Sequence, residues 1–542
     1  MDSHRLFERN LLALSTKNQE LCTRLKASGA GPDRYRFRQA SSGETIPAII
    51  DGSGVARPLH STVNPKREAE RLVSAAQGDF VVFLGLGAGF APSAALNLPG
   101  ISGVLIIDYD IDGIAELFRA CDYTDLLGDP RLTLLVDPPL ALIESVILDL
   151  YRPALFGGIK VLPLRARTEQ DRRNFGEASD AVRRGMEKVR ADYSVQAHFG
   201  CRWFSNIIRN IKAFPTHPPA NIPPVREVAI CAAGPSLDMQ IPLLLERKQK
   251  GQGIGIISTD TALPALMHRG LRPDAVVSID CQHISYQHFM GSVCRGIPLF
   301  LDIASPPLLS TLSDSPIFFL GGHPLAMYLR HKWMDLPVLD TSGGNVTFAC
   351  LSLAESLGAT RITVCGADFS YPAGKIYARG TYVFPYFERR QNRLSPLEAQ
   401  ASAFLFRSPF LPAEPETSGH RYETATMLAY RQSFEHKAHG MAADITVMPG
   451  LGFSVITLAS PATVPWCGGQ PKMGAVEFLE GYRRDISALP PLDRVGERTW
   501  VFTTLLPLMA ALKHRHQELS PPELFEAVKL YCTDEIGKIL NS

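Results

Sequence analysis

The strongest restriction on the fold comes from an apolar run that ends in a glycine-rich loop. FVVFLGLGAGF, residues 80–90, places five apolar residues before a GxGxG pattern that starts at Gly85. A helical stretch follows, and a second apolar run, residues 103–112, then carries Asp108. This order predicts a β-α-β unit of Rossmann type, in which the glycine turn lets backbone amides approach a ligand.

The acidic residues of the second run allow two functional interpretations beside a structural one. The glycine loop followed by Asp108 resembles S-adenosylmethionine enzymes more than NAD enzymes. The triplet Asp108-Tyr109-Asp110 looks like the DxD by which some glycosyltransferases hold a metal, because residues i and i+2 of a strand face the same side. We favour a tight turn and an acidic strand end in a noncatalytic domain, because many folds share these patterns without sharing function.

A proline-rich stretch, residues 214–227, separates this region from the rest of the chain. Its paired prolines exclude a regular helix or a central strand, so we place a domain boundary there. Beyond it, short apolar runs alternate with helical stretches, which is typical of a mainly parallel sheet with both faces covered. The runs span residues 228–231, 254–258, 275–279, 299–303, 317–320 and 362–365.

We therefore expect an α/β fold with a Rossmann-like, mainly parallel sheet in a central domain at residues 221–455. A second Rossmann-like domain, residues 76–215, precedes it, and an N-terminal helical segment occupies residues 1–75. Residues 456–542 are expected to form a helical domain, since a capping box at residues 520–523 opens a stripe of apolar residues at helical spacing.

Composition narrows the class of protein. The 55 basic and 54 acidic residues leave a net charge of +1, which gives no support to a nucleic-acid-coating or basic membrane-surface protein. The sequence has no run of about 18 apolar residues, so no membrane span is indicated. Ten cysteines without CxxC spacing predict reduced thiols in a cytoplasmic protein. His283 and His288 near Cys281 lack the second ligand pair of a zinc site.

Polar groups follow the apolar runs of the central domain, at the edge where a parallel sheet binds its ligands. Gly234 and Ser236 belong to GPSLD, a turn that opens a helix whose unpaired amides suit a phosphate. The turn TSGG, residues 341–344, opens another helix. Acids at the ends of other runs are Asp260, Asp280 and Asp368.

Four motifs in this order resemble the motility-associated factor (Maf) family: GPSLD, STDTALPALMHRGLRPDAVVSID, TSGG and CGADFSY. The opening FERNLLALSTKNQEL also looks like the N-terminus of that family. Maf proteins are proposed flagellin glycosyltransferases that move pseudaminic or legionaminic acid, two nine-carbon acidic sugars, onto serine or threonine. The resemblance implies a flagellin O-glycosyltransferase with a CMP-activated nonulosonic acid as donor and flagellin as partner, needed for flagellar assembly and motility.

The same central motifs are similar to two other groups. One is a bacterial family of sialyltransferases that use CMP-sialic acid, so the central domain is expected to be a sialyltransferase-like glycosyltransferase domain. The other is the archaeal MptE group, which transfers diphosphate from ATP to a hydroxymethylpterin. An MptE-like ATP-dependent pterin diphosphokinase and a noncatalytic flagellin assembly factor therefore stay open as alternatives.

The sialyltransferase resemblance implies roles for individual residues. His420 matches a histidine general base, and imidazole suits that role because its pKa lies near operating pH. Asp368 is the second catalytic candidate, and Lys375 and Arg379 could pair with the carboxylate of the sugar. The residues that match donor-binding positions are Gly234, Ser236, Ser342, Gly343, Tyr371 and Tyr377.

The chain departs from that family at two acids. Asp260 and Asp280 stand where the sialyltransferases have asparagine, so amides that read a nucleotide have become carboxylates. Two acids facing one phosphate repel it unless a cation intervenes. We therefore expect Asp260 and Asp280 to bind the donor and, tentatively, to hold Mg²⁺ or Mn²⁺. The alternatives are that one acts as a base, or that both hold ribose hydroxyls or cap helices.

Overall fold

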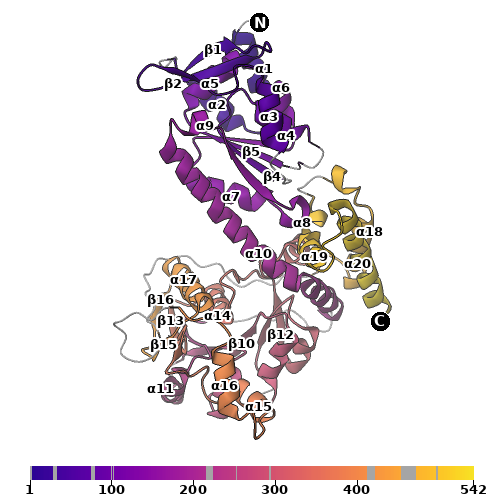
Figure 1. Cartoon of the computed structure of the whole chain (residues 1–542). Helices are drawn as coiled ribbons and strands as arrows, with labels where there is room; N and C mark the ends of the chain where they lie inside the picture. The colour runs from indigo at the N-terminus through magenta and orange to yellow at the C-terminus, as the bar shows by residue number, and fades with distance from the viewer. Residues whose placement is uncertain are drawn as a thin grey trace. The chain divides into compact units, whose positions relative to one another are not determined.

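The computed structural model describes residues 3–28, 33–74, 80–98, 101, 103–214, 224–251, 253–291, 294–411, 421–452, 471–495 and 499–542. The chain forms two compact units. Met1–His198 with Met509–Leu524 make the first, and Phe199–Leu508 with Phe525–Ser542 make the second. Each unit holds a parallel sheet flanked by helices (Figure 1), which confirms the α/β fold class.

The first unit contains a four-stranded parallel sheet in the order β6-β5-β4-β7. Its strands are β4 (Phe80–Leu84), β5 (Gly103–Asp108), β6 (Leu132–Val136) and β7 (Ile159–Pro163). Every residue of β4 is buried, as expected for a central parallel strand that is covered on both faces. The helix α4 (Phe90–Leu96) connects β4 to β5, and this confirms the predicted β-α-β unit.

Helices enclose this sheet. Leu11 and Leu14 from the first helix share one apolar core with Val81 and Phe83 of β4. The helices of the first unit are α1 (Ser3–Ser15), α2 (Gln19–Ala27), α3 (Pro65–Ser74), α5 (Ile111–Ala120), α6 (Thr124–Gly128), α7 (Leu140–Leu150), α8 (Pro153–Phe156) and α9 (Arg165–Thr168). The long helix α10 (Arg172–Ala213) begins in this unit and ends in the second.

The N-terminal segment, residues 1–75, is not purely helical as we expected. It also contains an antiparallel sheet of β1 (Tyr35–Gln39), β2 (Thr45–Ile50) and β3 (Ala56–Pro58). The strand β1 buries only Tyr35, and its four remaining residues are exposed. A strand without alternating burial lacks the periodic signal by which strands are recognised in a sequence.

The second unit contains a seven-stranded, entirely parallel sheet in the order β12-β11-β10-β9-β8-β13-β16. The predicted parallel central sheet is confirmed. Its strands are β8 (Glu227–Cys231), β9 (Gly255–Thr259), β10 (Ala275–Ser278), β11 (Leu299–Asp302), β12 (Pro316–Phe319), β13 (Arg361–Cys365) and β16 (Asp444–Val447).

The strand order reverses beside β8. The chain adds β9 to β12 on one side of β8, and then places β13 and β16 on the other side. In such sheets, ligands bind beyond the carboxyl ends of the strands at the point of reversal. The turns after β8 and β13 are therefore neighbours at the edge where a ligand is expected.

Alternate residues of each strand serve the two faces of this sheet. Val228 and Ile230 join one apolar core, while Ala229 and Cys231 join the other. The surrounding helices are α11 (Leu237–Gln249), α12 (Leu263–His268), α13 (Pro324–Lys332), α14 (Val346–Ser356), α17 (Ala425–His439) and the 3₁₀ helices η2 (His283–Phe289) and η3 (Pro307–Leu312).

Two further groups of elements complete the chain. An aromatic cluster forms around the short strands β14 (Tyr371–Pro372) and β15 (Arg421–Tyr422) with α15 (Val383–Glu388) and α16 (Leu397–Leu405). The last described elements are α18 (Ala475–Ser487), η4 (Leu492–Arg494), α19 (Trp500–Arg515) and α20 (Pro521–Asn541). They are helical, but they do not form a compact unit of their own, because Met509–Leu524 belong to the first unit and the neighbouring residues to the second. Among the described residues, no helix combines the length and hydropathy that crossing a membrane requires.

Candidate functional site

Two predicted site residues pair where the strand order reverses. Ser236 lies in the turn after β8, and Asp368 follows β13. The Ser236 amide donates to Asp368 Oδ2 at 2.8 Å, and the Ser236 hydroxyl donates to Oδ1. Both residues are almost fully buried. In this arrangement Asp368 holds the GPSLD turn in place, although 132 positions separate the two residues.

Close backbone approach explains the glycines around this pair. A Cβ on Gly234 would collide with the Asp368 carboxylate. The segment after β16 comes equally near, because a Cβ on Gly450 would collide with Ser236. The Leu451 amide donates to Ser236 Oγ at 2.6 Å. Atoms of the chain itself therefore surround the Ser236 hydroxyl.

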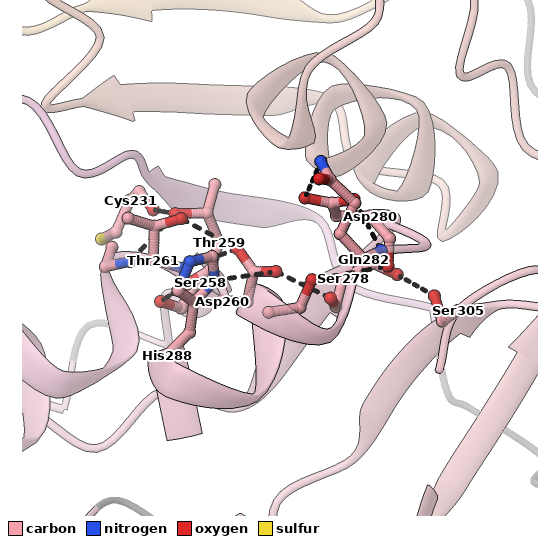
Figure 2. Close-up of polar contacts among 12 residues, drawn as sticks. Cys231, Ser258, Thr259, Asp260, Thr261, Ser278, Asp280, Gln282, His288 and Ser305 are labelled. Carbon is pink, nitrogen blue, oxygen red and sulfur yellow. Dashed lines mark hydrogen bonds and ion pairs between the residues drawn. The ribbon is translucent and has the colours of Figure 1, made fainter. Parts of the chain in front are cut away.

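Asp260 lies at the end of β9 and is fully buried (Figure 2). Its Oδ1 accepts a hydrogen bond from the Thr261 amide at 2.6 Å, and its Oδ2 accepts one from the Ser278 hydroxyl at 2.7 Å. His288 Nδ1 lies 3.3 Å from the same Oδ2. Burial alone would raise the pKa of Asp260, but the His288 imidazole and these hydrogen bonds outweigh it and lower that pKa.

His288 is a residue that the sequence analysis considered only as a metal ligand. It lies on η2, and its ring packs 4.4 Å, centroid to centroid, from that of Tyr382. The pairing with Asp260 joins the end of β9 to a helix that follows β10. A contact between segments 28 residues apart has no spacing signal, so only the fold reveals it.

Asp280 follows β10 and is half-buried. Its Oδ1 accepts a hydrogen bond from the Gln282 amide at 2.9 Å. Burial raises the pKa of Asp280, the Gln282 amide opposes this, and the negative charge of Asp260 adds to it. The charge of Asp260 thus acts on Asp280.

The fit of a metal ion to these acids is poor. Both oxygens of Asp260 already accept hydrogen bonds. Across the described residues there is no group of three or more histidines, cysteines or acids that could hold a metal. We therefore derive no chemical step through a cation, and the Mg²⁺ or Mn²⁺ on Asp260 and Asp280 stays a prediction.

The two tyrosines that match donor-binding positions, Tyr371 and Tyr377, belong to the aromatic cluster. Tyr371 starts β14, and its phenol interacts with Arg407. Burial raises the pKa of Tyr377, and the neighbouring tyrosines and the charge of Asp260 raise it further. The charge of Asp260 likewise contributes to the raised pKa of Tyr382, after burial and against Arg407. Asp260 thus lies close enough to the aromatic cluster for its charge to act on Tyr377 and Tyr382.

The TSGG turn precedes α14. Ser342 is exposed, and its amide and hydroxyl donate to Asp340 Oδ1 at 3.0 and 2.7 Å. Gly343 is buried against Phe348, whose ring a Cβ would overlap. Asn345 caps α14 by accepting from the Phe348 amide at 3.0 Å. The position of Gly343 therefore has a packing reason in addition to the expected nucleotide contact.

Asp302 is an acid at this edge that the sequence analysis missed. It ends β11 and is 9% exposed. Its Oδ1 accepts a hydrogen bond from the Ala304 amide at 2.8 Å. Burial raises the pKa of Asp302 to about 6. The available signal was the run LFLD, an apolar strand that ends in an acid like the strands before Asp260 and Asp280.

The chain is similar to known proteins both in sequence and in fold. Residues 205–374 match the family described as "6-hydroxymethylpterin diphosphokinase MptE-like". Over 99% of its length the chain is similar to 95% of the solved Maf glycosyltransferase from Magnetospirillum magneticum AMB-1, with a TM-score of 0.58 and 14% identity. Residues 205–374 are thus similar to the MptE-like family, within a chain whose fold is similar to that of a Maf glycosyltransferase. The resemblance to Maf proteins is thereby confirmed at the level of the fold.

Sequence relatives cover less of the chain. One uncharacterized protein of Treponema pallidum (strain Nichols) is 41% identical over 170 residues, which is 30% of this chain and 60% of the relative. Another is 36% identical over 110 residues, which is 20% of this chain and 51% of the relative. The chain thus spans between half and two thirds of these relatives. Their names assign no activity.

The sequence analysis also predicted roles for His420, Lys375 and Arg379. His420 lies outside the described residues. Lys375 and Arg379 are exposed on the segment after β14. The Arg379 amide donates to Asp238 at 3.2 Å, so this segment packs on the start of α11. Contact of the two cations with a sugar carboxylate stays a prediction.

The glycine loop of the N-terminal sheet is filled by protein atoms. The Leu86 amide donates to Asp108 Oδ2 at 2.7 Å, and the Ala88 amide donates to His60 Nε2 at 2.9 Å. Gly87 has φ +51°, and a Cβ there would lie 2.5 Å from the same His60 nitrogen. Burial lowers the pKa of His60 to about 4, so the imidazole accepts this bond in its neutral form.

The acidic triplet after this loop has structural partners. Asp108 is fully buried and pairs with Arg167 at 3.1 Å. Asp110 caps α5 by accepting from the Gly113 amide at 3.3 Å. It also pairs with Arg34 at 3.1 Å. These contacts agree with the interpretation of the loop and triplet as a tight turn and an acidic strand end.

Proposed function

We propose that this protein is a glycosyltransferase that moves a nonulosonic acid, pseudaminic or legionaminic acid, from a CMP-activated donor to serine or threonine of flagellin. The observation that carries the proposal is similarity to a Maf glycosyltransferase over 99% of the chain, which includes both parallel sheets. A transferase that acts on a protein must also bind that protein, and the parts of the chain outside the donor-binding sheet could do so. The reaction would be needed for flagellar assembly and motility. It would take place before flagellin is exported.

In the proposed reaction, the acceptor oxygen attacks the anomeric carbon, and the bond between that carbon and the phosphate oxygen breaks. CMP leaves with the bonding electrons, and a base takes the hydroxyl proton. Inversion at the anomeric carbon is what the sialyltransferase resemblance implies. Tyr371, Tyr377 and the nearby Arg407 would stabilise the charge that develops on the phosphate.

The acid–base roles follow from the contacts of each candidate. His420 remains the proposed base. Both oxygens of Asp368 bond to Ser236, so we assign Asp368 the positioning of the donor loop rather than proton transfer. Gly234, Ser236, Asp260 and Asp280 would lie along the donor, with Ser342 and Gly343 at its cytidine.

One alternative has a specific observation in its favour. The matched family is that of a pterin diphosphokinase, and the match covers Asp260 and Asp280. An ATP-dependent kinase would need a divalent cation near these acids, and the poor fit of a metal to them counts against this alternative. The noncatalytic flagellin assembly factor remains the alternative without nucleotide chemistry.

Thermal melting of the full chain with CMP, CDP, UDP or ATP, each with and without Mg²⁺ or Mn²⁺, tests the proposal. A ligand that binds only the folded state raises the midpoint by mass action. We expect CMP to raise it and ATP not to. Incubation with CMP-activated nonulosonate should then add the mass of the sugar to flagellin. A shift with ATP plus metal alone would overturn the proposal, and no shift with any nucleotide would favour the assembly factor.

A further inference from the structure

Asp302 uses one of its two carboxylate oxygens in a hydrogen bond within the described part of the chain. Its Oδ1 accepts from the Ala304 amide, whereas its Oδ2 makes no hydrogen bond to the described part of the chain. The residue is 9% exposed, and no cation pairs with it among those same residues. Oδ2 is not among the fully buried atoms without a partner, so it offers an acceptor to a ligand at the edge where a parallel sheet binds its ligands.

A second unpaired oxygen converges on the same point. A Cβ on Gly321 would lie 2.5 Å from Asp302 Oδ2 and 3.0 Å from Thr341 Oγ1. Within the described residues the Thr341 hydroxyl makes no hydrogen bond, and Gly321 has no positive φ that would require glycine. Glycine therefore lets this strand end pack directly against Asp302 Oδ2 and Thr341 Oγ1, and the close approach brings a carboxylate and a hydroxyl together at the ligand edge of the sheet.

The backbone beside Asp302 is fixed by two buried asparagines of α10. Asn206 Nδ2 donates to the carbonyls of Ala304 and Cys281 at 2.8 and 3.1 Å. Asn210, one helical turn later, donates to the carbonyls of Ile303 and Ser305, both at 2.8 Å. Because the Ala304 amide orients Asp302, the three hydrogen bonds to residues 303–305 hold the acid in one position, as a preorganised binding site requires.

We propose that Asp302 and Thr341 bind the ribose hydroxyls of the nucleotide. Acids at strand ends of parallel sheets accept hydrogen bonds from ribose, whose two adjacent hydroxyls supply two donors. Asp302 Oδ2 offers an acceptor, and Thr341 Oγ1 can either donate or accept. Thr341 directly precedes Ser342 and Gly343, the proposed cytidine contacts. The inference rests on the proposed function only in taking the ligand to be a nucleotide.

Calorimetric titration of the full chain with CMP and with 2′,3′-dideoxy-CMP tests this subsite. Asp302→Asn removes the charge and keeps an oxygen that can accept from the Ala304 amide. We expect the wild type to bind CMP roughly 10- to 100-fold more tightly than the dideoxy analogue, as for hydrogen bonds to a charged group. Asp302→Asn should lose that preference by weakening CMP alone.

Two further variants test the subsite without changing Asp302. Gly321→Ala places a methyl group between the two oxygens and should weaken CMP by a similar factor. Thr341→Val removes only the hydroxyl and should weaken CMP several-fold. Asp335→Asn is the matched control, because Asp335 is an exposed acid paired with Arg330 at 2.8 Å. It should bind both nucleotides like the wild type.

The outcomes separate this inference from the proposed function. Equal binding of CMP and the dideoxy analogue by the wild type overturns it. So does a variant at Asp302 that binds CMP normally but transfers no sugar, because the acid would then act on the acceptor hydroxyl. Binding of ATP with the same dependence on the ribose hydroxyls supports the subsite while the proposed sugar transfer fails. If no nucleotide binds, both fail.

Discussion

Replacing Asp302 by asparagine should stabilise the protein at neutral pH. In the folded protein the pKa of Asp302 is about 6, against an ordinary value of 3.8, and burial is the cause. The folded state therefore binds this proton more tightly than the unfolded state. Between these two pKa values, stability falls as pH rises, and the loss is complete above about pH 6. At about 1.4 kcal/mol per pH unit, the loss amounts to about 3 kcal/mol.

Asparagine carries no charge, so the variant should avoid this loss. Melting of the wild type and of Asp302→Asn at several pH values between 4 and 8 measures the difference. We expect the variant to melt several degrees higher at pH 7.5 and at the same temperature near pH 4. Asp335→Asn, an exposed acid, should shift little at any pH. A gain of equal size at every pH, or a loss at pH 7.5, would refute the assignment to ionisation of Asp302.

Three further changes are expected to act on stability, each measured by urea unfolding. Asp260→Ala leaves His288 and two hydroxyl groups without their acceptor and should cost roughly 3 kcal/mol at pH 7; because the pKa of Asp260 is lowered, the cost should shrink as the pH falls below about 4. Gly87→Ala forces a side chain into a left-handed conformation against protein atoms and should cost at least ~1 kcal/mol without changing CMP affinity. Arg167→Met should cost about 3–5 kcal/mol by leaving Asp108 buried and unpaired, and Asp108→Asn in the same chain should restore part of it.

The sheets could be predicted because burial imposes simple patterns. The run at residues 80–84 is apolar throughout, and β4 occupies those residues. The run predicted at 228–231 became β8 (Glu227–Cys231) for the same reason. β16 (Asp444–Val447) escaped prediction because it is short and buries fully only Ile445. Hydrophobic periodicity and apolar runs are local properties of a sequence, so a strand that lacks both can be recognised only in the structure.

The candidate site could be predicted only as a set of positions. The motifs placed acids and glycines at strand ends, since a parallel sheet has one carboxyl edge. The sequence could not show which acid contacts which group. Asp368 proved to bond Ser236, and Asp260 proved to pair with His288. Such pairings depend on how far neighbouring turns project, and this is decided by packing between segments that are distant in the chain.

In both glycine turns of this chain, a backbone amide already donates a hydrogen bond to an aspartate of a neighbouring strand. In the first unit, an acid at the end of the neighbouring strand accepts from the Leu86 amide. In the second, Asp368 accepts from the Ser236 amide, and the Gly234 amide donates to a backbone carbonyl at 2.8 Å. Amides that are already paired are poor phosphate donors. Uncommitted oxygens lie instead beyond β11 and β12, at Asp302 and Thr341, so specificity for the nucleotide is expected from side chains there.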